Sequence, residues 1–242
     1  MDNDDRPVGR ILTRREALVL LGASGYAILG RHAPLSGQAG SAPAPCVVRP
    51  AQTEGPYFVD EMLHRADVRS DPSDGSVRPG TPLALTLVVS RLEGNACRPM
   101  SGVHVDLWQC DHEGIYSDVQ DPSFNTKGKK FLRGYQLTDA EGKATFQTIY
   151  PGWYRGRTVH IHFKLRTTPR AASGHEFTSQ LYFDDALTDR VFQAAPYAAR
   201  GARSTRNNAD GIFRQNGTQL IADVRPSGQG YAGTFQVAFQ GV

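Results

Sequence analysis

The residues with the clearest chemistry lie in one short stretch, His160-Ile161-His162. Successive side chains of a β-strand face opposite sides, so His160 and His162 project from one face, while Val159, Ile161 and Phe163 occupy the other. Two imidazoles on one face suit a metal ion. A lone His-x-His pair is equally compatible with a polar strand face exposed to water, so further ligands are needed before the pair indicates a metal site.

Two tyrosines could supply those ligands. Tyr154 precedes His160 by six residues, and Tyr116 lies 38 residues before Tyr154. Because phenol titrates at about pH 10, tyrosine is a good ligand only where a strongly Lewis-acidic cation holds it as phenolate. Zinc sites use Cys, His and carboxylates, and soft metals prefer thiolate or thioether. Two tyrosines with two histidines therefore indicate iron(III).

Several motifs, taken in order, resemble the intradiol ring-cleavage dioxygenases, the non-haem iron(III) enzymes that include protocatechuate 3,4-dioxygenase and catechol 1,2-dioxygenase. The resemblance runs from Thr53-Glu54-Gly55-Pro56-Tyr57 to Gln180-Leu181-Tyr182-Phe183. Between these ends lie Trp108 to Tyr116, Arg133-Gly134, Pro151-Gly152-Trp153-Tyr154, and Arg157 followed by His160-Ile161-His162. The resemblance implies a β-sandwich catalytic core with iron held between a sheet and loops.

The resemblance also implies which residues bind the metal. Tyr116, Tyr154, His160 and His162 would be the four protein ligands of Fe(3+), and Tyr154 would additionally accept a proton from the substrate. The implied reaction cleaves a catechol-type ring between its two hydroxylated carbons with O2, giving a cis,cis-muconate-type product. The partners implied are thus a small aromatic substrate and O2.

Four further residues match positions around the substrate in this family. Arg157 would stabilise negative charge on the bound substrate, a role that its permanent charge suits. Gln180 would act close to the iron, and Pro56 and Tyr57 would line the substrate pocket. Each has a plainer interpretation: a surface arginine in a short loop, a hydrogen-bonding strand residue, and packing beside a turn.

The identity of the catechol is left open by the sequence. Only five residues separate Tyr154 from His160, fewer than in the protocatechuate and catechol enzymes, and this interval borders the substrate. Catechol, hydroxyquinol, protocatechuate and substituted catechols all present the same chelating edge. Two other classes of function also stay open: an exported β-sandwich that only binds, and a zinc hydrolase that adds a carboxylate to His160 and His162.

Hydrophobic periodicity predicts an all-β fold for residues 46–242. Apolar side chains alternate with polar ones at 83–89, 103–107, 159–165 and 235–239, and turn-forming clusters separate these segments. Short strands at such spacing are typical of a β-sandwich with long loops. The one helix expected runs from Ala186 to Ala194 and stops near Pro196.

Composition limits the class of protein. The chain of 242 residues is 39% hydrophobic, so residues 46–242 can bury the core of a single catalytic domain. The formal charge of +3 offers no basic patch for nucleic acid. Assembly into a homo-oligomer is compatible with the sequence.

Residues 1–45 are interpreted as a cleavable signal peptide with a flexible lead-in. Arg14-Arg15 followed by an apolar run to Gly30 resembles a twin-arginine export signal, although Ala17 stands where such signals usually carry Phe. An ordinary Sec signal or a membrane-anchoring tail is the alternative. The mature protein is thus expected in the periplasm or outside the cell, with no stable membrane span.

Three cysteines follow the expected signal segment. An oxidising compartment would permit one disulfide, and Cys46–Cys97 is favoured because Cys110 lies in the motif that carries Tyr116. Three buried free thiols are the alternative.

Overall fold

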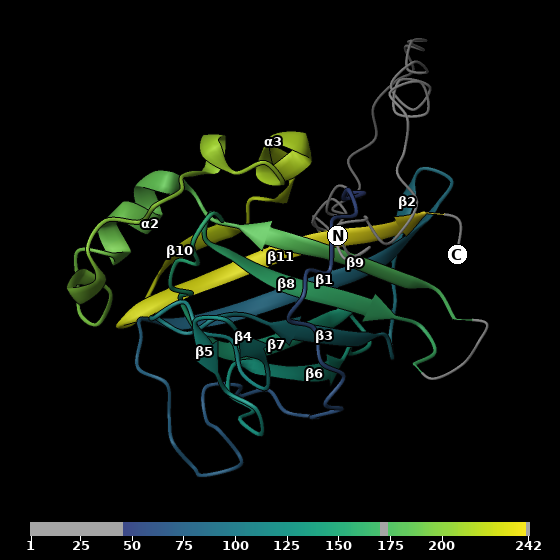
Figure 1. Ribbon diagram of the computed structural model, residues 1–242. Helices are drawn as coiled ribbons and strands as arrows, with labels where there is room; N and C mark the ends of the chain where they lie inside the picture. Colours follow the sequence, from purple (N-terminus) through teal and green to yellow (C-terminus); the bar gives the residue numbers. More distant parts are fainter. Residues whose placement is uncertain (1–45, 170–173, 241–242) are drawn as a thin grey trace.

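The computed structural model describes residues 46–169 and 174–240, which form two β-sheets packed face to face (Figure 1). The predicted β-sandwich is confirmed. The expected signal segment 1–45 lies outside the described residues. Within the described part of the chain, the helices are too short and too polar to cross a membrane.

The first sheet is organised around two long strands that run parallel to each other, β1 (Pro82–Glu93) and β11 (Gly230–Gln240). Three shorter strands pair antiparallel with them: β10 (Asp223–Ser227) with β11, and β2 (Ala96–Pro99) and β7 (Lys143–Ile149) with β1. On β1 the alternate side chains of Leu83, Leu85, Leu87 and Val89 are fully buried. This sheet therefore presents one apolar face, as its alternation predicts.

The second sheet has four strands, and every neighbouring pair is antiparallel. In spatial order they are β6 (Arg133–Leu137), β3 (His104–Trp108), β8 (His160–Arg166) and β9 (Glu176–Tyr182). A small hairpin of β4 (Gln120–Asp121) and β5 (Phe124–Asn125) lies outside both sheets.

The hydrophobic core lies between the sheets. Ile161, Phe163 and Leu165 of β8 are fully buried on its inward face. Across the interface, the ring of Phe163 meets that of Phe235 on β11 with centroids 5.4 Å apart. The inward face of β8 thus anchors the strand that carries His160 and His162.

The outward face of β8 is also buried, because residues 51–65, here called the strap, cross over it. Gln52 N donates to Thr178 O on β9, and Arg65 N donates to Tyr135 O on β6. Buried charges need partners, and the strap supplies them: Lys164 pairs with Glu54, and Arg166 pairs with Asp60. His160 and His162 share this covered face with the two cations.

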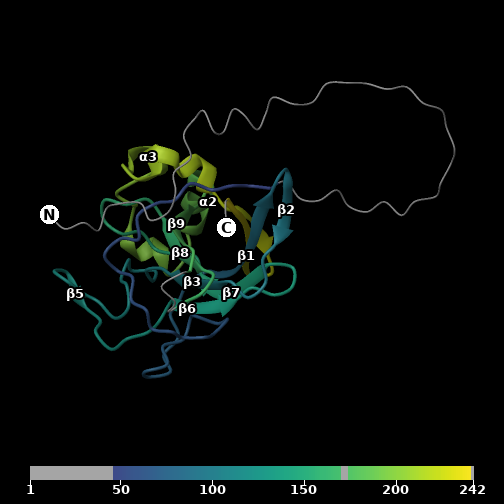
Figure 2. The same ribbon diagram turned by 90° about the vertical axis from the view of Figure 1, so that its right-hand side faces the viewer.

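The helices gather on one side of the sheets (Figures 1 and 2). They are α2 (Asp185–Val191), η2 (Tyr197–Arg200), η3 (Asn207–Ala209), α3 (Phe213–Asn216) and η4 (Gly217–Leu220). The last four were not predicted, because such short helices show no apolar periodicity.

The predicted helix Ala186–Ala194 is correct in position and wrong at its end. α2 begins after Asp184, whose carboxylate accepts from the backbone N–H of Ala186 and Leu187. It ends at Val191, because the next amides tighten into a turn in which Ala194 N donates to Val191 O.

The favoured disulfide is present, between Cys46 and Cys97, and ties the start of the described chain to β2. Cys110 is a buried free thiol, and burial raises its pKa. The alternative of three free thiols is therefore wrong.

Candidate metal centre

Strand register brings the aromatic and polar residues of the site together. On β8, His162 lies opposite Trp108 of β3 and opposite Gln180 of β9. The imidazole of His162 stacks on the indole of Trp108, with centroids 5.0 Å apart and planes inclined by 9°. The Trp108 ring thus packs against one candidate ligand.

The four predicted ligands converge. His160 Nε2 lies 3.0 Å from His162 Nε2 and 3.3 Å from the hydroxyl of Tyr116. The ring of Tyr154 stands edge-on to that of Tyr116, with centroids 6.1 Å apart. His160, His162 and Tyr116 therefore bring their donor atoms to one place beneath the strap, and the Tyr154 ring lies beside Tyr116.

The histidines are held in the form that binds metals. His160 Nδ1 donates to Thr158 O at 2.6 Å, which leaves the lone pair on Nε2. Burial, and then the charge of Arg157, lower the pKa of His160 to about 3. Burial and His160 lower the pKa of His162 well below its usual value, and its buried Nδ1 has no hydrogen-bond partner in the described structure.

The burial of the Tyr116 phenol limits which cation fits this site. Its side chain is 1% exposed, and burial raises its pKa well above the usual value, an effect that Arg157 opposes. A buried phenol becomes phenolate only beside a compensating cation. Two neutral imidazoles with two phenols are a donor set that fits Fe(3+).

A zinc site with a carboxylate ligand finds no support. Zinc needs a third protein ligand beside His160 and His162. Within the residues that the structure describes, no cluster of three His, Cys, Asp or Glu side chains is placed to hold a metal. Asp106 instead accepts from Arg166 on the same sheet.

Tyr154 begins a short chain of hydrogen bonds that leads away from the donor atoms. The hydroxyls of Tyr154 and Tyr57 are 2.5 Å apart, and Tyr57 donates to Asp121 Oδ2 at 2.6 Å. Because Tyr57 has one proton and gives it to Asp121, Tyr154 is the donor to Tyr57. The Tyr57 ring also stacks on Tyr116, with centroids 4.5 Å apart. Burial, and then the bond to Asp121, raise the pKa of Tyr57.

Arg157 and Gln180, predicted around the substrate, bind each other, whereas Pro56 lies at the surface of the strap. Arg157 donates to Gln180 Oε1 at 2.6 Å, and Gln180 donates to Thr53 O of the strap at 2.9 Å. Pro56 is exposed. Its neighbour Gly55 has φ +73°, and a Cβ there would lie 3.4 Å from His162 Cε1, so the strap passes directly over that imidazole.

Two carboxylates of the site were missed by sequence reasoning, Asp121 and Asp210. Asp121 lies 64 residues from its partner Tyr57, and Asp210 lies 53 residues from its partner Arg157. Both look like ordinary turn residues in the sequence, beside Pro122 and Gly211 respectively. No local signal distinguishes them from other loop aspartates.

A cavity of about 540 Å³ opens beside Tyr154. Its walls include Ile115, Phe124 and Trp153, with Asp121 and Arg155 at its polar part. Cavities of this size with aromatic walls are typical of small-molecule sites.

Comparison with known proteins decides the family. A family profile described as Dioxygenase matches residues 53–212, a segment that contains every predicted site residue. The structure of an intradiol ring-cleavage dioxygenase from Tetranychus urticae superposes with a TM-score of 0.65 and 31% identity, covering 81% of this chain and 94% of that chain. This chain belongs to the intradiol dioxygenase family.

Two further members of the intradiol dioxygenase family match over shorter stretches. The protocatechuate 3,4-dioxygenase beta chain of Burkholderia cepacia is 33% identical over 152 residues, which is 58% of this chain and 63% of that protein. Catechol 1,2-dioxygenase 2 of Acinetobacter lwoffii is 32% identical over 158 residues, or 61% of this chain and 52% of that protein. The chain thus matches less than two thirds of the length of either protein.

Proposed function

We propose that this intradiol dioxygenase binds Fe(3+) and cleaves a catechol-type ring between its two hydroxylated carbons with O2, giving a cis,cis-muconate-type product. The observation that carries the proposal is the convergence on His160 Nε2 of His162 Nε2, at 3.0 Å, and of the Tyr116 hydroxyl, at 3.3 Å, with the Tyr154 ring beside Tyr116. The names of the two matched relatives, which act on protocatechuate and catechol, support this substrate class. A binding module without catalysis would have no need of both phenols.

Tyr116, Tyr154, His160 and His162 would hold the iron. When bound, Fe(3+) would act as a Lewis acid toward the catechol oxygens and so prepare the ring for reaction with O2. Thr158 O keeps the proton of His160 on Nδ1, so that Nε2 stays available as a ligand. The stacked indole of Trp108 fixes the plane of His162.

Tyr154 would receive a proton from the substrate. A phenolate oxygen at Tyr154 would act as the base, and protonation there would give the phenol whose O–H donates to Tyr57. Tyr57 in turn donates to Asp121, so both phenol protons have an acceptor. Arg157 places its positive charge near the same donor atoms, where it would stabilise negative charge on the substrate.

Isotope labelling tests the reaction. Purified iron-loaded protein is given a panel of catechols under 18O2, and the ring-opened product is examined by mass spectrometry. We expect both labelled oxygen atoms in an acyclic dicarboxylate formed by cleavage between the hydroxylated carbons. Cleavage beside the two hydroxyls, or no oxygen uptake with any member of the panel, would contradict the proposal.

Removing the Tyr57 hydroxyl tests the proton pathway. Tyr57→Phe keeps the ring that stacks on Tyr116 but leaves the protonated Tyr154 without its acceptor. We expect kcat for catechol cleavage to fall about 100-fold, which is the low end of general acid–base effects. Stopped-flow and steady-state kinetics measure this fall.

Tyr135→Phe is the matched control for Tyr57→Phe. The ring of Tyr135 stacks on His64 and His104, away from the donor atoms. This variant should retain the wild-type kcat. A Tyr57→Phe enzyme as active as Tyr135→Phe would show that the hydroxyl carries no proton.

We also propose that the protein is exported by the twin-arginine route to the periplasm or the extracellular space. The Cys46–Cys97 disulfide supports export, because disulfides persist in oxidising compartments. Arg14→Lys with Arg15→Lys should leave uncleaved protein in the cytoplasm, as read by fractionation and intact mass. Normal export of this variant would indicate a Sec signal instead.

A further inference from the structure

We propose that Asp210 is the positioning residue that aims Arg157 at the substrate and holds Thr158, the residue whose carbonyl orients His160. The inference rests on the proposed function, since it assigns Arg157 a role toward bound catechol. Asp210 lies in the loop between η3 and α3, on the side of the molecule where the helices gather.

The carboxylate of Asp210 is fully buried and fully engaged. Its Oδ2 accepts from Arg157 Nε at 2.9 Å and from Thr158 N at 2.7 Å. Its Oδ1 accepts from Ile212 N at 2.7 Å and Phe213 N at 3.0 Å. A buried carboxylate with four donors is costly to disturb, because each lost partner leaves a desolvated group unpaired.

Asp210 is ionised in this environment. Burial opposes the charge, but Arg157 and the backbone N–H groups of Phe213 and Thr158 outweigh it, so the pKa of the carboxyl is lowered. Asp210 is 0% exposed, while the Arg157 side chain is 18% exposed, so one face of the ion pair is closed and the other is partly open. The Asp210 carboxylate is therefore closed to a ligand, whereas the Arg157 guanidinium can contact one.

Two bonds fix the plane of the Arg157 guanidinium. Nε donates to Asp210 and Nη2 donates to Gln180 Oε1 at 2.6 Å, so the planar fork is held at two of its nitrogens. The Gln180 oxygen also accepts from the Tyr182 hydroxyl at 3.0 Å. The Arg157 side chain is nevertheless 18% exposed, which leaves part of it open to a substrate oxygen.

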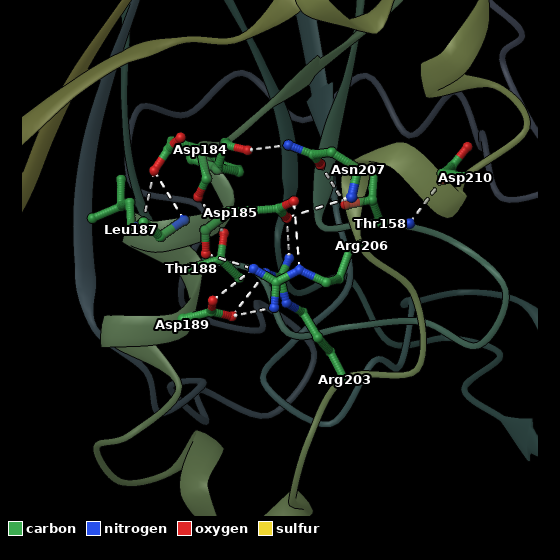
Figure 3. Close-up of polar contacts among 12 residues, drawn as sticks. Thr158, Asp184, Asp185, Leu187, Thr188, Asp189, Arg203, Arg206, Asn207 and Asp210 are labelled. Carbon is green, nitrogen blue, oxygen red and sulfur yellow. Dashed lines mark hydrogen bonds and ion pairs between the residues drawn. The ribbon is translucent and has the colours of Figure 1, made fainter.

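The same carboxylate braces the ligand strand. Asp210 holds the N–H of Thr158, and Asn207 accepts from Thr158 Oγ1 at 2.6 Å. Thr158 O is the acceptor for His160 Nδ1. Thr158, whose carbonyl sets the tautomer of His160, is therefore held by Asn207 of η3 and by Asp210, as the bonds from Thr158 in Figure 3 show.

An ion-pair cluster holds this clamp in place (Figure 3). Arg203, whose side chain is 5% exposed, donates to Asp185 Oδ1 at 2.6 Å and to Asp189 Oδ1 at 2.8 Å. Asn207 Nδ2 donates to Phe183 O at 2.9 Å. The segment that carries Asn207 and Asp210 is thus fastened to α2 and to the end of β9 rather than left as a mobile loop.

A double-mutant cycle tests the proposal on the holoenzyme. The four proteins are the wild type, Asp210→Asn, Arg157→Ala and the double variant, compared by kcat and KM for catechol and by anaerobic spectroscopic titration with 4-nitrocatechol. Because a misplaced positioning group can cost about 100-fold, we expect Asp210→Asn to lower kcat about 10- to 100-fold and to weaken probe binding about tenfold. In the Arg157→Ala background the same change should lower kcat by a clearly smaller factor, since only the support of Thr158 is then left to lose and coupled residues are not additive.

Controls separate positioning from loss of stability. Asp71→Asn removes another fully buried carboxylate that binds backbone N–H groups, those of Ser73 and Lys130, away from the site. It should lower the melting temperature about as much as Asp210→Asn and leave kcat unchanged. Asp210→Glu keeps the charge and should fold if Asp210→Asn does not, with an intermediate kcat. The iron content of Asp210→Asn should equal that of the wild type.

Two outcomes would overturn the proposal: equal losses of kcat from Asp210→Asn in the wild-type and Arg157→Ala backgrounds, or a wild-type kcat in Asp210→Asn. If the wild type cleaves no catechol, the proposed function fails on its own. The coupling of Asp210 and Arg157 is then read from thermal unfolding of the same four proteins, and additive changes in stability would overturn it.

Discussion

His162→Ala is expected to abolish iron retention and catechol cleavage while changing the stability of the apoprotein by no more than about 1–2 kcal/mol. The imidazole contributes one of the converging donor atoms, with Nε2 3.0 Å from that of His160. Its loss removes a ligand for which no other side chain in the described cluster substitutes. Its buried Nδ1 makes no hydrogen bond, and His160 Nε2, which faces its Nε2, keeps the Tyr116 hydroxyl as a partner at 3.3 Å. Iron content, turnover and thermal unfolding of the apoprotein measure the three effects.

Phe163→Ala is the matched control, one residue further along the same strand. Phe163 is fully buried on the opposite face of β8 and packs against Phe235. Removing its ring should cost about 3–5 kcal/mol of stability, and protein that stays folded should bind iron normally. If His162→Ala retained iron, or if it destabilised the apoprotein as strongly as Phe163→Ala, His162 would be a structural residue and not a ligand.

Tyr154→Phe should lower kcat at least about 100-fold while preserving part of the visible colour of the iron-loaded protein. The activity falls because the variant loses the base that receives the substrate proton and its link to Tyr57. The colour persists because Tyr116 is fully buried beside His160 and still binds as phenolate. Steady-state kinetics and the visible spectrum of one preparation show both effects.

Two results would contradict this division of roles between the tyrosines. A Tyr154→Phe enzyme with kcat within about twofold of the wild type would remove Tyr154 from proton transfer. A Tyr154→Phe protein that binds iron but has no colour would show that Tyr116 is not a ligand. Tyr116→Phe gives the complementary measurement and should retain colour only through Tyr154.

The shared face of His160 and His162 could be predicted from the sequence because its information is local. Alternation along β8 places His160 and His162 on one face and Phe163 on the other, and register then sets Gln180 and Trp108 beside His162. The side-chain chemistry then indicates the metal, since phenols and imidazoles together suit few metals. The same alternation predicts the apolar face of β1.

The support of the site could not be predicted, because it depends on contacts between distant segments. The sequence does not show that the strap covers the outward face of β8, where Lys164 and Arg166 are buried against Glu54 and Asp60. The sequence also gives no sign that Asp210 accepts a hydrogen bond from Arg157. Such pairs form when loops fold back over a sheet, and neither residue type nor periodicity predicts them.

The most direct test of the central claim is the visible absorption spectrum of the purified wild-type protein, recorded with its metal content before and after anaerobic addition of catechol. We predict about one iron per chain and a broad tyrosinate-to-iron(III) charge-transfer band that shifts when catechol chelates the metal. Colourless protein that contains zinc, or an iron-loaded protein whose spectrum does not respond to catechol, would contradict the account.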